Sequence, residues 1–490
     1  MMARRRHMRH RSRTPLQVVK PSRDICIELD DHACVTRSAI DFFGNRGSVD
    51  PAPQAARFAD QFITQNATIL RLLDVSIRRD YDGTDLLLHI ESKGAVGAVP
   101  LISPLSARPD FGLVVQPRFP WAGIGPMLAE MGWRITPTPL NLPLLRRSER
   151  RVPPWVLSCM VLARLKTLLD RLERRFELTT EMQPAPKGTV DWTSYATRAL
   201  PCGNFLSIPC TYPDLRDDRQ LKGAIRFAIE AQLRSLQTQH EHGAFIHRLI
   251  ALADSLLQRV SNVRSHRPEV RDVELWLRRP MRSAGFIEGL QAIDWTVEER
   301  GLAGRSDLEG LPWTMPMEQF FEAWVETILR GVARQTGGIL RSGRARETVA
   351  PLLWEPPYLG SQRSFVPDLI LETERTSLIV DAKYKRHWEE LQEGSWYEQS
   401  AALRKQHRAD LLQVLAYANL APTPDIICCL CYPCSQATWD SLTARDRLFH
   451  RADLPNRGRR VQVWLTAIPM GSSVNLIGAP FIEQLRAQGF

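Results

Sequence analysis

The sequence has no long hydrophobic run. Among its 490 residues there is no stretch of 18 apolar residues, and prolines and polar residues interrupt the most apolar segment, 411–432. Because a membrane-spanning helix needs about 20 mostly apolar residues, we expect no membrane segment. The basic first residues are not followed by an apolar core, as a secretory signal would be. We therefore expect a cytoplasmic protein.

Cysteine is sparse and irregularly spaced. Nine cysteines in 490 residues do not form a disulfide framework, which favours a reducing compartment. Four of them form a short run: Cys428, Cys429, Cys431 and Cys434. Such a run could ligate an iron–sulfur cluster, but the cysteines that bind such a cluster usually come from separate segments of the chain. We favour a thiol-rich buried strand.

Nucleotide-binding and sequence-reading motifs are also missing. We find no GxxxxGK[ST] loop, so the chain is not expected to hydrolyse nucleotide by itself. We recognise no helix-turn-helix or zinc finger either. Lys and Arg total 64 against 54 for Asp and Glu, a net charge of +10, which makes nucleic acid a candidate partner. Five arginines form a run that is either a solvated face or a phosphate-tracking groove: Arg330, Arg334, Arg341, Arg344 and Arg346.

The pattern along the chain predicts a multi-domain α/β protein. Residues 1–24 form a basic tail that we expect to be disordered. Short strands with Gly and Pro between them predict a β-rich N-terminal domain over 25–150. Apolar residues at helical spacing predict a helical middle domain over 151–305. The order α-β-β-β-α-β predicts a C-terminal α/β domain over 306–475.

Two acidic residues and a lysine stand at the ends of two predicted C-terminal strands. Asp368 begins one strand, Asp381 ends the next, and Lys383 follows two positions later. Because side chains alternate along a strand, Asp381 and Lys383 share a face, and a hairpin would bring Asp368 to Asp381. Two carboxylates and one ammonium suit Mg²⁺, with Mn²⁺ also possible. A metal-bound water is easier to deprotonate, and Lys383 can orient it or bind a phosphate.

Helices on both sides of this motif carry further polar residues. Glu322 lies beside the apolar face of the upstream helix, and Glu318, one turn away, could take its place. Three downstream residues share one helix face: Asp410, Gln413 and Tyr417. Gln413 can reach a metal-bound water or a DNA phosphate. The alternatives are a solvated helix residue at Glu322 and a polar stripe over a core downstream.

The motif has the spacing of the PD-(D/E)xK nuclease superfamily, although acid-x-Lys is common by chance and a salt-bridged hairpin is the alternative. Further segments resemble McrC, the nuclease subunit of McrBC-type modification-dependent restriction systems: MEQFFEAWV at 317–325, VPD at 366–368, DAKYK at 381–385, DLLQVLAY at 410–417 and YP at 432–433. Upstream segments resemble the same family: GAVPL at 97–101, VQPR at 115–118, KGTVDW at 187–192 and the segment 210–222. Gln220 stands where the family usually has Asn, and residues 1–84 match nothing recognisable.

The resemblance implies a C-terminal PD-(D/E)xK restriction-endonuclease-like domain and a metal-dependent endodeoxyribonuclease of a prokaryotic defence system. It implies a catalytic set: Asp368, Asp381, Lys383, Glu322 and Gln413. It implies a set of metal ligands: Asp368, Asp381, Ala382 and Glu322. The expected partners are DNA with modified bases and a McrB-like AAA+ ring, which would dock on the middle domain and have its hydrolysis stimulated. The alternatives are a non-catalytic DNA-binding adaptor and an RNA-processing nuclease.

Overall fold

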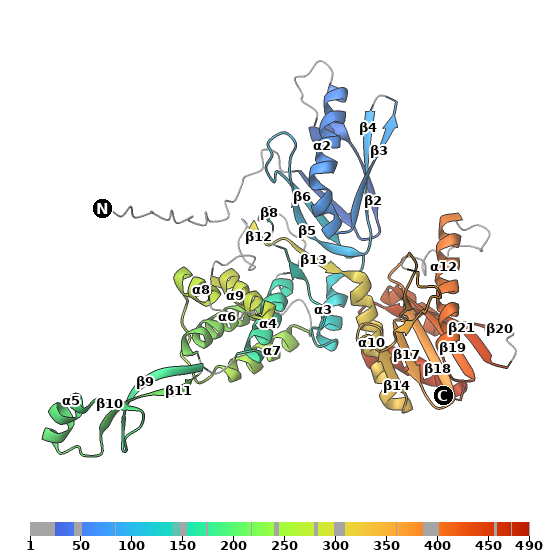
Figure 1. The fold of residues 1–490 in the computed structure, drawn as a ribbon. Coiled ribbons are helices and arrows are strands. Elements are labelled where there is room, and N and C mark those ends of the chain that lie inside the picture. Colours follow the sequence, from blue (N-terminus) through green and yellow to red (C-terminus); the bar gives the residue numbers. More distant parts are fainter. Residues whose placement is uncertain are drawn as a thin grey trace. The chain divides into compact units, whose positions relative to one another are not determined.

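The computed structural model describes most of the chain: residues 25–43, 51–83, 85–140, 142, 145–146, 153, 155–172, 175–216, 218–239, 245–278, 283–297, 309–358, 360–385, 401–454, 458–471 and 473–489. The predicted tail at 1–24 lies outside these residues. The chain divides into two compact units, one of residues 1–153 and 305–490 and the other of 154–304. Figure 1 shows sheets with helices against them in the first unit, and mainly helices in the second. The predicted mixed α/β, multi-domain architecture is confirmed at this level.

The described N-terminal part of the first unit contains two larger sheets and the short antiparallel pair of β8 (Leu145–Arg146) and β12 (Glu309–Gly310). The larger has the order β1 (Ile25–Asp30), β6 (Phe111–Gln116), β5 (Ala95–Leu101), β13 (Trp313–Pro316) and β7 (Thr138–Pro139). The smaller is the antiparallel sheet of β2 (Cys34–Ser38), β4 (Asp85–Ser92) and β3 (Val75–Asp82). Every second residue of β4 is buried, as expected for a strand that covers a core with one face.

A long helix in this part was missed by the sequence analysis. The helix α2 (Pro51–Leu72) spans 22 residues, in a region predicted to consist mainly of strands and turns. Proline is tolerated in the first turn of a helix, so the prolines at its start do not prevent it. Phe62 anchors the helix, because its ring centroid lies 5.3 Å from those of both Phe43 and Phe111. Two shorter helices, α1 (Ala39–Phe43) and α3 (Trp121–Glu130), complete the region.

One strand of the N-terminal sheet comes from the C-terminal half of the sequence. β13 pairs with β5, with Trp313 opposite Ala98, and runs directly into the helix α10 (Met317–Thr336). A Cβ atom at Gly97 would lie 2.1 Å from the carbonyl oxygen of Trp313, so the close approach of the two strands requires glycine here. The predicted boundary at 306 therefore assigned a strand of the N-terminal sheet to the C-terminal domain.

The C-terminal part of the first unit is built on a six-stranded sheet. Its order is β14 (Ile339–Ser342), β17 (Leu369–Glu372), β18 (Thr376–Ala382), β19 (Asp425–Cys434), β21 (Arg460–Pro469) and β20 (Phe449–Leu454). The strands β18, β19 and β21 run parallel, and the other pairs are antiparallel. β18 and β19 are buried along almost their whole length, as central strands covered on both faces are.

Several C-terminal boundaries differ from the prediction. The sequence pattern predicts a helix over 409–420. The helix α12 (Ala401–Tyr417) begins eight residues earlier, and the short helix η4 (Ala418–Leu420) follows it. The pattern also predicts a strand at 352–354, but the structure has no strand at these residues. Two short strands lie on either side of them, β15 (Ala350–Pro351) and β16 (Ser364–Phe365). α13 (Gln436–Ala444) lies before β20, and α14 (Val474–Ala487) after β21 extends the fold past the predicted end at 475. α14 packs against α10.

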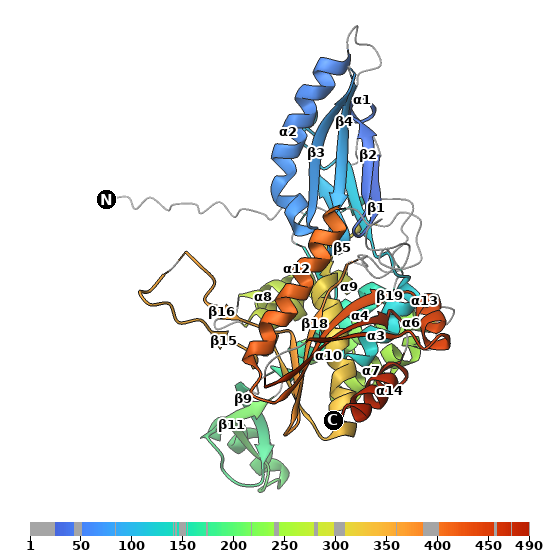
Figure 2. The same ribbon diagram turned by 90° about the vertical axis from the view of Figure 1, so that its right-hand side faces the viewer.

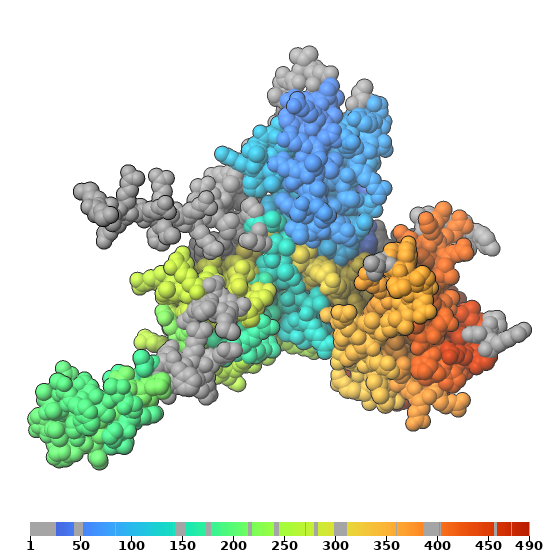
Figure 3. Space-filling model, in the orientation of Figure 1, coloured from blue at the N-terminus to red at the C-terminus, as the bar shows by residue number. Residues whose placement is uncertain are grey.

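The second unit is mainly helical. Its helices are α4 (Trp155–Asp170), α6 (Arg219–Gln237), α7 (Phe245–Arg259), α8 (Val270–Leu277) and α9 (Ala284–Val297). A long antiparallel pair, β9 (Arg175–Gln183) and β11 (Ile208–Arg216), projects from them and carries β10 (Thr189–Val190), α5 (Trp192–Ser194), η1 (Tyr195–Ala199) and η2 (Leu200–Cys202). The far end of this hairpin forms a separate lobe within the unit (Figure 3). No helix in the described part of the chain is long and apolar enough to cross a membrane.

Candidate active site

The hairpin of β17 and β18 brings the two predicted aspartates together. Leu369 pairs with Val380, so Asp368 and Asp381 are the next residues along the two strands. The amide N–H of Ala382 donates a hydrogen bond to Oδ2 of Asp368, at 2.8 Å. This bond holds the carboxyl group of Asp368 beside the end of β18, where Asp381 lies.

Lys383 completes this cluster. Its Nζ lies 2.7 Å from Oδ2 of Asp381, which agrees with side chains two positions apart facing the same way. The side chain of Asp381 is 0% exposed, and its Oδ1 has no hydrogen-bond donor among the described residues. A buried carboxylate oxygen without a donor is costly. A bound cation would remove that cost.

The protonation of the two carboxyl groups is strongly perturbed. Burial, followed by the charge of Asp381, raises the pKa of Asp368 to about 8. Burial also raises the pKa of Asp381, although Lys383 opposes the effect. When one of them is protonated, the two groups can share that proton in a hydrogen bond. Burial would lower the pKa of Lys383, but the two aspartates outweigh it and raise that pKa, so the lysine stays charged.

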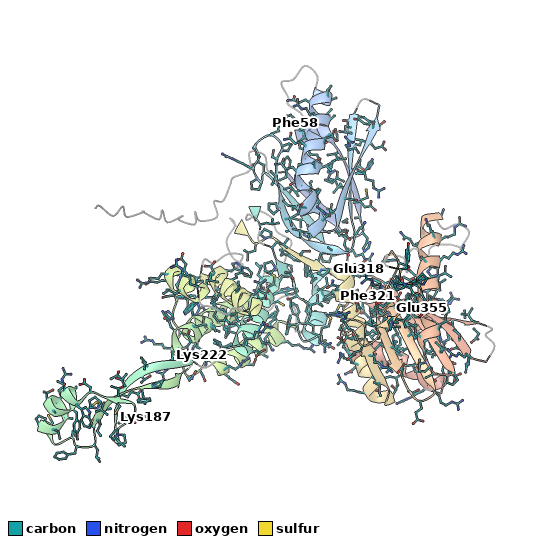
Figure 4. All side chains as sticks on the ribbon, viewed as in Figure 1. Phe58, Lys187, Lys222, Glu318, Phe321 and Glu355 are labelled. Carbon is teal, nitrogen blue, oxygen red and sulfur yellow. The ribbon has the colours of Figure 1, made fainter. Side chains whose placement is uncertain are left out.

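Of the two glutamates considered on α10, Glu322 is the one that faces the cluster. Burial raises its pKa, the charge of Asp381 adds to the effect, and Arg344 opposes it. Glu318, near the start of α10 (Figure 4), points elsewhere. A Cβ at Gly94 would lie 2.9 Å from Cγ of Glu318, so Glu318 lies against the residue that precedes β5.

The downstream residues near the cluster differ in burial. Asp410 is buried and accepts hydrogen bonds from Nζ of Lys385 at 2.6 Å and from the hydroxyl of Tyr432 at 3.2 Å. Gln413 is exposed, and its Nε2 donates to the hydroxyl of Tyr417 at 2.9 Å. Burial, with the charges of the two site aspartates, raises the pKa of Tyr417. No role for Lys385 follows from the sequence, because its pairing with Asp410 depends on the packing of α12 against the sheet.

A turn after β14 holds one of the predicted arginines at the site. The amide of Gly343 donates to the carbonyl oxygen of Asp368 at 2.8 Å, and Oγ1 of Thr348 donates to that of Pro367 at 2.6 Å. This places Arg344, an exposed residue of the turn, where its charge acts on Glu322. Two other members of the arginine run form ion pairs instead: Arg330 with Glu326, and Arg341 with Glu372.

A buried cluster from the N-terminal sheet covers the segment just after Lys383. The amide of Arg118 donates to Oδ1 of Asp31 at 2.8 Å, and the Arg118 guanidinium carbon lies 4.6 Å from the centre of the Tyr384 ring. The Tyr384 ring also lies 5.7 Å from His32 and 6.2 Å from Phe119. The sequence analysis missed this arrangement, although it noted both Arg118 and Tyr384 within family-like segments.

The donor set fits a small hard cation that is completed by substrate. Among the described residues, no three acidic, histidine or cysteine side chains lie close enough to hold a metal ion alone. Mg²⁺ commonly takes one or two protein carboxylates, with waters and substrate phosphate as its other ligands. Asp368 and Asp381 supply two, and Glu322 adds negative charge nearby. Of the predicted ligands, Ala382 places its main-chain amide at Asp368.

The cysteine run lies on the buried part of strand β19. Its four cysteines are buried and free of disulfides, as the preferred interpretation predicted. Sγ of Cys429 and Sγ of Cys431 lie 3.8 Å apart, whereas Cys428 faces the other side of the strand because neighbouring residues alternate. The four thiols therefore do not converge on one cluster site.

The chain was compared with known proteins. The profile of the family described as "McrBC 5-methylcytosine restriction system component" matches residues 133–433, more than half of the chain. None of the curated proteins matches. One similar solved structure is a half-complex from a tetradecameric assembly of Thermococcus gammatolerans McrB AAA+ hexamers with bound McrC, with 14% identity, a TM-score of 0.39, and coverage of 94% of this chain and 99% of that chain. Another is the Thermococcus gammatolerans McrBC complex, with 13% identity, a TM-score of 0.24, and coverage of 63% and 88%.

Proposed function

Because the chain belongs to the McrBC 5-methylcytosine restriction system component family, we propose that it is the McrC-like nuclease subunit of such a system. Its six-stranded domain would then be a PD-(D/E)xK nuclease that hydrolyses phosphodiester bonds of DNA. The observation that carries this proposal is the convergence of Asp368, Asp381 and Lys383 at the end of the β17–β18 hairpin.

Asp368 and Asp381, supported by Glu322, would hold Mg²⁺ or Mn²⁺. When bound, this ion would lower the pKa of a coordinated water and stabilise charge on the phosphate. Without a cation, the raised pKa values of the aspartates mean that the pair retains a proton near neutral pH. Binding a cation would release that proton, because the ion takes over the stabilisation of the buried charge.

Lys383 supplies the fixed positive charge of the mechanism. Its raised pKa keeps Nζ protonated, and Asp381 holds the ammonium in place at 2.7 Å. An ammonium there can bind a phosphate oxygen as a point charge or orient the attacking water. Gln413 would act further out, through its hydrogen bond to Tyr417.

We further propose that a McrB-like AAA+ ring is the partner that gates cleavage and whose hydrolysis the chain stimulates. Support comes from the family and from exposed apolar residues on the β9–β11 hairpin: Leu178, Met182, Trp192, Leu200, Phe205 and Leu206. Apolar residues gathered on an exposed surface mark a protein interface. Lys187, labelled in Figure 4, lies on the same hairpin with its Nζ 3.7 Å from the centre of the Tyr212 ring. The complex would act in the cytoplasm on DNA with modified bases.

The test is cleavage of modified plasmid by the chain with its ring partner, nucleotide and Mg²⁺. Asp381→Asn and Lys383→Ala should each reduce the rate by about 10²-fold or more, because each removes a charge placed at the reacting phosphate. Asp425→Asn is the matched control, because Asp425 opens β19 opposite Thr376, at the other end of β18 from Asp381. Full cleavage by Asp381→Asn would exclude this site and leave the non-catalytic adaptor as the better proposal.

A further inference from the structure

The segment between the Arg344 turn and Asp368 forms a hairpin of its own. Its base is the pair β15 and β16, with Ala350 opposite Phe365 and Pro351 opposite Ser364. The amide of Leu352 donates to the carbonyl oxygen of Arg363 at 2.8 Å. Figure 2 shows the loop between the two strands extending away from the sheet of its unit. We call residues 349–358 and 360–366 the β15–β16 hairpin.

The base of this hairpin is attached to the candidate site on both sides. On one side, Thr348 donates to the carbonyl oxygen of Pro367, the residue before Asp368. On the other side, the Phe365 ring packs edge-on against Tyr417, with centroids 6.0 Å apart. Burial raises the pKa of Tyr417, and the charges of the two site aspartates add to this effect. The hairpin therefore begins and ends beside the acidic cluster.

The rest of the hairpin exposes large apolar side chains. Leu353 is 91% exposed, Tyr358 60% and Trp354 44%. The Trp354 indole N–H donates to the carbonyl oxygen of Gln362 at 2.9 Å, and its ring lies 6.4 Å from that of Tyr358. The two rings are thus held by the hairpin itself. Three large apolar groups exposed together mark a binding surface.

The charge next to these side chains favours nucleic acid as the ligand. Arg344 and Arg346 are exposed on the turn that precedes the hairpin, and Arg363 is exposed within it. Glu347 and Glu355 (Figure 4) are the two acidic residues between 344 and 366, against these three arginines. Guanidinium groups bind phosphates, whereas aromatic and apolar side chains stack on bases or enter between them. A surface with both kinds of group matches a DNA strand, with its charged backbone and flat bases.

We propose that the β15–β16 hairpin binds DNA beside the scissile phosphate. Leu353, Trp354 and Tyr358 contact the bases and disturb their stacking, while the arginines contact the backbone. The inference rests on the proposed nuclease function and deepens it, because it assigns a base-contacting element to the same site. Any DNA phosphate that reaches Asp368 and Asp381 brings its neighbouring nucleotides to the hairpin, whose last residue lies two positions before Asp368.

The test compares the full-length chain with the triple variant Leu353→Ser, Trp354→Ser and Tyr358→Ser. The matched control is Leu454→Ser with Leu476→Ser, because these are exposed apolar residues on β20 and α14, which carry no candidate site residue. Binding of a fluorescein-labelled duplex is measured by anisotropy with Ca²⁺ in place of Mg²⁺. A second duplex carries 2-aminopurine at successive positions, because its fluorescence rises when bases unstack.

The triple variant should bind the duplex about tenfold more weakly or worse, since stacking on aromatic side chains contributes strongly to each bound base. It should also lose the 2-aminopurine signal, and the control should match wild type. Equal affinity and an equal signal in the triple variant would overturn the proposal. If that variant instead loses self-association or ring binding, the hairpin is a protein interface. Cleavage of DNA by the wild-type chain with its ring partner, nucleotide and Mg²⁺ separates these results from failure of the nuclease proposal, in which the wild-type complex does not cut.

Discussion

The guanidinium of Arg118 lies over the ring of Tyr384, with its carbon 4.6 Å from the ring centre. Arg118 follows β6 of the N-terminal sheet, and Tyr384 follows Lys383 at the candidate site. Asp31 lies beside both residues, since it accepts a hydrogen bond from the amide of Arg118 and raises the pKa of Tyr384, which burial has already raised. The N-terminal sheet is therefore part of the support of the site. A fragment without residues 1–300 would lose this support and the strand partners of β13.

Arg118→Met should destabilise the first unit, because the buried Asp31 carboxylate would lose its positive neighbour. We expect the free energy of unfolding to fall by about 3 kcal/mol. The double variant with Asp31→Asn should recover most of this loss, since no buried charge then remains. Urea unfolding of the two single variants and the double variant measures the coupling, with Arg108→Met, an exposed arginine of the same region, as the control. If the losses of the two single variants simply add in the double variant, Arg118 and Asp31 do not interact as a pair.

The buried aspartates predict a pH-dependent response to metal. The pKa of Asp368 is raised from 3.8 to about 8 on folding, so the folded state holds its proton more tightly than the unfolded state. Stability without metal should therefore fall as pH rises between these two values. Mg²⁺ competes with the proton, so it should raise the Tm more at pH 8 than at pH 5.

Thermal unfolding of wild type and Asp368→Asn, with and without Mg²⁺, checks this prediction. The variant carries a neutral amide at every pH, so its Tm should depend less on pH and respond less to Mg²⁺. Asp425→Asn should behave as wild type does. An equal Mg²⁺ response at both pH values, or in Asp368→Asn, would show that the ion binds elsewhere.

The pair of Lys385 and Asp410 should respond unequally to removal of its two members. The side chain of Asp410 is 4% exposed, whereas that of Lys385 is 30% exposed. Lys385→Met removes the ammonium that lies 2.6 Å from this buried carboxylate and should cost about 3 kcal/mol. Asp410→Asn leaves a lysine that can reach water, so it should cost about 1 kcal/mol. Urea unfolding measures the loss in each variant. A larger loss in Asp410→Asn than in Lys385→Met would contradict the greater burial of Asp410.

The β9–β11 hairpin predicts a separable docking defect. Phe205→Ser with Leu206→Ser should weaken binding of the AAA+ ring and reduce its stimulated hydrolysis, because both side chains are exposed and apolar. Folding should be unchanged for the same reason. Leu275→Ser, an exposed leucine on α8 of the same unit, is the control. Unchanged binding and stimulation would place the docking surface elsewhere.

The acidic hairpin was predictable because its determinants are local. Period-two alternation and short sequence separation are enough to bring Asp368 to Asp381, and a neighbouring helix face indicates Glu322. The structure adds Lys385 as the partner of Asp410, which only packing of α12 against the sheet could reveal. Whether these residues cleave DNA stays a prediction.

Distant pairings were not predictable. β13 pairs with a strand more than 200 residues earlier, and no local pattern identifies that partner. The contact of Arg118 with Tyr384 depends on the same arrangement. The helix α2 was missed for a different reason, since Pro51 and Pro53 resemble turn signals although the first turn of a helix tolerates proline.

The pairing of β13 with β5 also has a consequence for synthesis. A ribosome makes β5 and β6 before it makes the whole of 154–304, and only afterwards β13. Until then, the edge of β5 that β13 will cover has no partner from the native sheet. The intervening unit, with its consecutive helices and local contacts, can fold during this interval. A chain released before Trp313 would expose the strand edge of β5, a template for aggregation.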